Sequence, residues 1–218
     1  MIVAEQKDLK EILEMTAPYH EILIVGCNMC MAACSAGGQE EVEKLAKDLV
    51  SERKDLIVEK STIPRQCSIK FINRLKDKVR GFKAILSMGC GNGVQMMAKQ
   101  FPNKHVLPAL NTRFIGAKDE NGVWNETCMA CGNCILWKTG GICPITRCAK
   151  GLLNGPCGGS RDGMCEISMD VPCVWQEIYH SLNRLNLVHY LKEEVLQTKI
   201  RIHPRKIVRK DLQPQLLL

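Results

Sequence analysis

The chain has 218 residues, a formal net charge of +7 and thirteen cysteines, the one extreme value in its composition. An odd cysteine count argues against a complete set of disulfides, and the first ten residues lack the apolar run of a secretory signal. No stretch reaches the ~18 apolar residues that a membrane span requires. Composition therefore predicts a cytoplasmic protein without a membrane span, whose clustered cysteines serve metal or redox chemistry.

Apolar periodicity predicts alternating helices and strands in the first half of the chain. The expected helices cover 4–17, 40–54, 68–80 and 93–100, and the expected strands cover 22–25, 56–58, 84–86 and 105–110. Such alternation predicts an α/β fold with a small parallel sheet flanked by helices on both faces.

The sequence changes character after residue 112. Residues 113–173 contain eight cysteines, many glycines and little periodicity, and an apolar stripe returns only in a helix expected over 174–197. An irregular segment of this kind cannot bury enough apolar surface to fold alone, so a metal is expected to hold it together. The predicted parts are an α/β domain, a cysteine-rich iron–sulfur module with a C-terminal helix, and a basic tail, over 1–112, 113–198 and 199–218.

The positive charge is concentrated in that tail. Residues 199–210 hold six of the 30 Lys and Arg residues and no acidic residue, so the rest of the chain is nearly neutral. A bare basic segment would suggest nucleic acid. Here apolar residues interleave with the charges, namely Ile200, Ile202, Ile207 and Val208. The alternation favours a strand or a docking arm, and no nucleic-acid partner is expected.

The first group of cysteines is dispersed in sequence but converges in the predicted fold. It consists of Cys27, Cys30, Cys34, Cys67 and Cys90. Cys27, Cys67 and Cys90 follow three successive predicted strands, which places them at the carboxyl edge of the sheet, where open α/β folds bind ligands. Four thiolates at one point bind a [4Fe–4S] cluster or a zinc ion. The expected ligands are Cys27, Cys30, Cys67 and Cys90, with Cys34 as the substitute.

The second group contains the most specific motif. Cys128, Cys131 and Cys134 form a C-x2-C-x2-C run, which holds three corners of a [4Fe–4S] cluster in bacterial ferredoxins, whereas zinc sites more often use separated pairs. In a ferredoxin the Cys-Pro pair comes sooner after the C-x2-C-x2-C run than Cys143-Pro144 comes after Cys134 here. Cys143 is the expected fourth ligand, and the alternatives are Cys148, Cys157, Cys165 and Cys173. Eight cysteines would hold two clusters, or one cluster and a zinc ion.

These motifs resemble the small, MetV-type iron–sulfur subunit of bacterial methylenetetrahydrofolate reductase, within the family of the C-terminal domain of that reductase. The resemblance covers residues 20–190. It is carried by Cys27-x2-Cys30-x3-Cys34, Arg65-Gln66-Cys67, Cys90-Gly91-Asn92-Gly93, the Cys128 triplet, Cys143-Pro144, Asn154-Gly155-Pro156-Cys157 and Cys173-Val174-Trp175.

The resemblance implies an electron-transfer subunit that is not catalytic alone. Its partner would be a flavin-containing MetF-type subunit, a TIM barrel that reduces methylenetetrahydrofolate in the one-carbon metabolism of acetogens (the Wood–Ljungdahl pathway). Electrons would pass through two or three [4Fe–4S] clusters to that flavin. Ferredoxin or another subunit would donate them, and the tail would steer the donor or clamp the flavoprotein. The alternatives are a zinc-stabilised structural or regulatory subunit and a stand-alone thiol or corrinoid-linked protein.

Overall fold

The computed structural model describes residues 1–195 of the chain. The basic tail expected over 199–218 and the last residues of the helix expected over 174–197 lie outside the described residues. The chain divides into two compact units, Met1–Met129 and Ala130–Leu218. No helix within the described part has the length and apolarity needed to cross a bilayer.

A four-stranded parallel sheet forms the centre of the first unit. Its strands lie in the order β3-β2-β4-β5 and are β2 (Glu21–Cys27), β3 (Ile57–Ile63), β4 (Ala84–Met88) and β5 (His105–Pro108). The predicted parallel sheet is therefore confirmed. Because β2 pairs with β3 on one side and with β4 on the other, the strand order reverses between β2 and β4. Open α/β sheets bind ligands outside the carboxyl ends of the strands at such a reversal.

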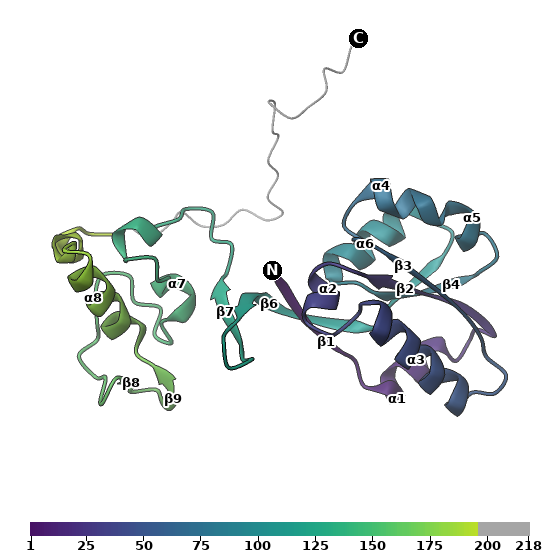
Figure 1. The fold of residues 1–218 in the computed structure, drawn as a ribbon, viewed down its shortest axis with the longest axis horizontal. Helices are drawn as coiled ribbons and strands as arrows, with labels where there is room; N and C mark the ends of the chain where they lie inside the picture. The colour runs from purple at the N-terminus through teal and green to yellow at the C-terminus, as the bar shows by residue number, and fades with distance from the viewer. Residues whose placement is uncertain (196–218) are drawn as a thin grey trace, which may run out of the picture. The chain divides into compact units, whose positions relative to one another are not determined.

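Helices cover both faces of this sheet (Figure 1). Ile22 and Ile24 of β2 face a core shared with α1 and α3, whereas Leu23 and Val25 face the core shared with α4, α5 and α6. This period of two explains why the central strand is apolar throughout. The helices are α1 (Leu9–Thr16), α2 (Cys30–Ala33), α3 (Gln39–Glu52), α4 (Ile69–Ile72), α5 (Lys76–Val79) and α6 (Gly91–Gln100). The helix expected over 68–80 is interrupted by a 3-10 turn, Asn73–Leu75.

A second sheet in this unit was not predicted. It has three antiparallel strands in the order β1-β6-β7, which are β1 (Ile2–Gln6), β6 (Leu110–Lys118) and β7 (Trp124–Cys128). The expectation that the first helix begins at residue 4 was wrong, because β1 pairs with β6 more than a hundred residues later. This second sheet lies within the first compact unit, Met1–Met129.

The second unit contains little regular structure. Its elements are η2 (Leu136–Lys138), α7 (Pro144–Arg147), β8 (Met164–Cys165), β9 (Ser168–Pro172), α8 (Val174–Arg184) and η3 (Val188–Lys192). Its small core is built around α8 by Trp175, Ile178 and Leu182. The helix ends at Arg184 because Asn186 adopts a left-handed φ of 60° and the Leu187 N–H bonds the Leu182 carbonyl at 2.8 Å. This is a Schellman motif, which stops a helix.

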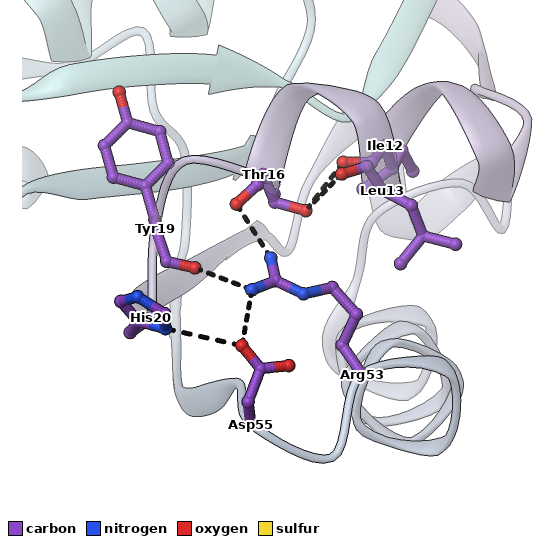
Figure 2. Close-up of polar contacts among 7 residues, drawn as sticks. All are labelled: Ile12, Leu13, Thr16, Tyr19, His20, Arg53 and Asp55. Atoms are coloured by element: carbon purple, nitrogen blue, oxygen red, sulfur yellow. Dashed lines mark hydrogen bonds and ion pairs between the residues drawn. The ribbon is translucent and has the colours of Figure 1, made fainter.

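One arginine fastens the turn between α1 and β2 (Figure 2). The Arg53 guanidinium donates to the carbonyls of Thr16 at 2.9 Å and Tyr19 at 3.2 Å, and to the Asp55 carboxylate at 2.9 Å. His20 lies 3.3 Å from the same carboxylate. The hydrogen bond from Arg53 is the main cause that lowers the pKa of Asp55 below its ordinary value.

Replacing Arg53 with methionine is expected to lower the free energy of unfolding by about 1–3 kcal/mol, because two backbone carbonyls lose a charged donor. The pKa of Asp55 is lower in the folded state than in the unfolded chain. Its ionised carboxylate therefore contributes to stability above the ordinary carboxyl pKa, and this contribution is lost as the pH falls through the folded-state pKa. The free energies of unfolding of wild type and Arg53→Met, measured by urea unfolding, should therefore become more similar as the pH is lowered. Arg80→Met is the control, because Arg80 is exposed and its only ion pair among those described is with Asp77. If Arg80→Met lowered the free energy of unfolding as much as Arg53→Met does, the role assigned to Arg53 would be contradicted.

Candidate metal centre

Three cysteines of the first group gather at the carboxyl edge of the parallel sheet. Cys27 is the last residue of β2, Cys67 lies in the loop between β3 and α4, and Cys90 follows β4 as the N-cap of α6. The Cys27 sulfur lies near enough to those of Cys90 and Cys67 to interact with both electrostatically. Cys27 and Cys90 flank the point where the strand order reverses. The fold thus brings together residues that are 63 positions apart in sequence.

Burial raises the pKa of the Cys27 thiol, since only 7% of the residue is exposed. The neighbouring Cys90 and Cys67 raise this pKa further, whereas the backbone N–H groups of Gln66 and Met29, which bond the sulfur, lower it. Without a metal the thiol is therefore protonated at neutral pH. A metal that binds this sulfur displaces the proton, so loading of the site is expected to weaken as pH falls.

A buried glutamine holds the cysteine loops in position. The side chain of Gln66 is fully buried; its amide nitrogen donates to the Val25 carbonyl of β2 at 2.7 Å, and its amide oxygen accepts from the Ser87 hydroxyl of β4 at 2.5 Å. Both central strands are thereby tied to the loop that carries Cys67. The role of Gln66 is not evident from the sequence, where the available signal is a polar residue between Arg65 and Cys67 in the loop after a strand.

Two glycines beside Cys90 make room for this glutamine. A Cβ atom at Gly89 would lie 2.6 Å from the amide oxygen of Gln66, and one at Gly93 would lie 2.9 Å from its Cβ. Contacts this short are not tolerated, so any larger residue there would displace Gln66 or the loop. Gly89 and Gly93 are therefore required by packing.

The remaining cysteines of the first group lie on α2. Cys30 begins this helix three residues after Cys27, is half-buried, and packs against the same core as Cys27 and Cys90. The Cys34 thiol donates to the Cys30 carbonyl at 3.1 Å, which caps the end of the short helix. This bond gives Cys34 a local structural role. Cys30 as the fourth ligand remains a prediction.

The second group of cysteines is divided between the units. Cys128 is the exposed last residue of β7 in the first unit, whereas Cys131 and Cys134 belong to the second. Cys143 is the N-cap of α7. The last four cysteines of the chain line one cavity of the second unit, and they are Cys148, Cys157, Cys165 and Cys173. Within residues 1–195, no three His, Cys, Asp or Glu side chains are placed around one point as a single metal ion requires.

The donor chemistry of the sheet edge suits an iron–sulfur cluster. Thiolates from separate segments can each bind a different iron of the cluster, and the N–H groups at the Cys27 sulfur compensate negative charge on a bound thiolate. Cys90 stands at the start of the ten-residue helix α6, whose positive dipole end suits the negative charge of a bound cluster.

Comparison with known families gives one match. Residues 107–201 match the family described as "Methylene-tetrahydrofolate reductase C terminal". This region includes the whole second group of cysteines and α8, and it is less than half of the chain. No curated protein and no solved structure matches the chain. The molecule is thus an α/β domain followed by a cysteine-rich region, and that region is similar to the C-terminal part of methylenetetrahydrofolate reductases.

Proposed function

We propose that this chain is the electron-transfer iron–sulfur subunit of a methylenetetrahydrofolate reductase complex. It passes electrons through [4Fe–4S] clusters to a flavin on a MetF-type catalytic partner. The observation that carries the proposal is the gathering of Cys27, Cys67 and Cys90 at the strand-order reversal of the parallel sheet. The family match over residues 107–201 supports the kind of reductase.

The residues of the sheet edge have distinct roles in this proposal. Cys27, Cys67 and Cys90 bind the first cluster, with Cys30 as the fourth ligand. Gln66 positions the loop of Cys67 through Val25 and Ser87. The apolar core beneath Cys27 keeps water from one side of the site, which lowers the local dielectric constant and influences the reduction potential. A bound cluster supplies reversible one-electron storage.

The second centre of the proposal follows from sequence spacing. Cys128, Cys131, Cys134 and Cys143 are its ligands, as the C-x2-C-x2-C run predicts. Ferredoxin, or a donor subunit of the same complex, supplies the electrons.

Anaerobic co-purification with the flavoprotein tests this function. Iron and sulfide are expected in equal amounts, together with absorption near ~400 nm that bleaches on reduction. Adding a low-potential donor should then reduce the partner's flavin only when this chain is present. Zinc without iron would instead support the zinc-stabilised structural subunit. Full stability and activity without any flavoprotein would support the stand-alone protein.

A further inference from the structure

The last four cysteines of the chain surround one cavity of the second unit. Cys148 is the C-cap of α7, Cys157 lies in the following loop, Cys165 ends β8, and Cys173 is the N-cap of α8. Four separate segments therefore each contribute one thiol to the same cavity. Spacings of nine and eight residues would not reveal this grouping, because the connecting loops have no periodicity.

Hydrogen bonds between these segments of the chain hold the cavity loops in place. The indole N–H of Trp175 donates to the Leu152 carbonyl at 3.3 Å, which joins the loop after Cys148 to α8. The backbone N–H of Cys173 donates to the Gly163 carbonyl at 2.8 Å, which joins β9 to the loop before Cys165. The cavity is thus defined by contacts between residues far apart in sequence.

Two of the four sulfurs already accept backbone hydrogen bonds. The N–H of Leu152 lies 3.4 Å from the Cys148 sulfur, and the N–H of Gly159 lies 3.4 Å from the Cys157 sulfur. Hydrogen bonds to cysteine sulfur are one of the ways in which proteins set the potential of an iron–sulfur cluster.

The cavity lining combines paired charges with an apolar side. Arg147, Lys150 and Glu166 line it; Lys150 pairs with Glu166, and Arg147 pairs with Glu177 at 2.8 Å. The apolar side of the cavity is formed by Leu152, Pro172, Val174 and Trp175. The apolar side restricts the access of water to a bound cluster, which influences its reduction potential.

The other four cysteines of the second group do not line this cavity. The Cys143 thiol lies 3.6 Å from the Thr146 hydroxyl, and the Cys131 thiol lies 3.5 Å from the Asn133 carbonyl. Among the described residues that line the cavity, none is Cys131, Cys134 or Cys143. The eight cysteines of the second group therefore divide into two sets of four.

We propose that Cys148, Cys157, Cys165 and Cys173 bind a [4Fe–4S] cluster of their own, separate from that of the C-x2-C-x2-C run. The inference rests on the proposed function, because it requires that the chain binds iron–sulfur clusters. It makes three four-cysteine centres in one chain and leaves Cys34, the helix cap, as the remaining cysteine. The four residues are thus not alternative ligands for the Cys128 triplet.

The test uses alanine variants of the full chain, purified anaerobically with its partner. Cys157→Ala and Cys165→Ala are each expected to remove the iron of one cluster, about four atoms per chain, with the matching EPR signal. The double variant should lose no more than either single one, because both changes affect the same cluster. Combining Cys157→Ala with Cys67→Ala should double the loss. Cys34→Ala is the matched control and should retain all iron.

Thiol alkylation keeps the test decisive if a variant folds poorly. Cys157 is exposed, so a free thiol there would react with iodoacetamide. In the iron-loaded wild type it should resist the reagent and become reactive once the iron is removed. Equal reactivity in both states would overturn the proposal. The proposal would also be overturned if Cys157→Ala or Cys165→Ala lost zinc in place of iron. It would be overturned as well if the double variant Cys157→Ala/Cys131→Ala lost the iron of no more than one cluster. Wild type without iron would instead refute the proposed function itself.

Discussion

Replacing Cys67 with alanine is expected to remove the cluster at the sheet edge while leaving the sheet folded. Cys67 is exposed, so its side chain contributes little to packing, and the free energy of unfolding of the metal-free protein should change by no more than about 0.5 kcal/mol. As a ligand, however, it holds one corner of the cluster, so about four iron atoms per chain should be lost. Iron and sulfide analysis with EPR of the reduced protein measures this loss.

Cys34→Ala is the matched control for this variant. Cys34 belongs to the same group of cysteines, but its thiol bonds the Cys30 carbonyl of its own helix. Iron content should be unchanged and stability slightly lower. Loss of iron in Cys34→Ala but not in Cys67→Ala would show that Cys34 is a ligand and that Cys67 is not. Loss in neither would remove the sheet-edge site from the proposed function.

Replacing Gln66 with leucine is expected to lower the free energy of unfolding by about 2–4 kcal/mol. Leucine has similar volume but leaves two buried groups without their partner, the Val25 carbonyl and the Ser87 hydroxyl. The loop that carries Cys67 loses its attachment to β2 and β4. Cluster retention at the sheet edge should therefore fall as well, which is measured as slower iron uptake during reconstitution and faster loss to a chelator.

Gln95→Leu is the control for this second prediction. Gln95 is exposed, and its amide donates to the Gly91 carbonyl of its own helix at 3.0 Å. The substitution should leave both stability and iron retention close to those of wild type. If Gln66→Leu lowers stability but retains iron as wild type does, Gln66 supports the sheet without positioning the site.

The sheet edge was predictable because it follows from local patterns. The apolar run at residues 22–25 and its counterparts at 56–58 and 84–86 specify buried strands, and parallel strands necessarily align their carboxyl ends. Cys27 and Cys90 come directly after two of those strands, and Cys67 lies in the loop that follows the third, so the sequence alone places them at the edge. The family match lies outside this region, and the sheet-edge residues are supported by geometry instead.

Two features depended on contacts that no local pattern records. β1 pairs with β6, and since this partner is more than a hundred residues away, the short segment Ile2–Gln6 resembles the start of a helix in sequence. Gln66 is important because its two partners lie on different strands.

By itself, then, the sequence determined the parallel sheet and the three cysteines at its edge, because periodicity of side chains is a local property. Only the tertiary structure decided which cysteines of the second unit share a cavity. Cys148, Cys157, Cys165 and Cys173 are joined by irregular loops, whose course depends on left-handed glycines such as Gly158 and Gly163 and on hydrogen bonds between distant segments. Such contacts form only in the folded chain.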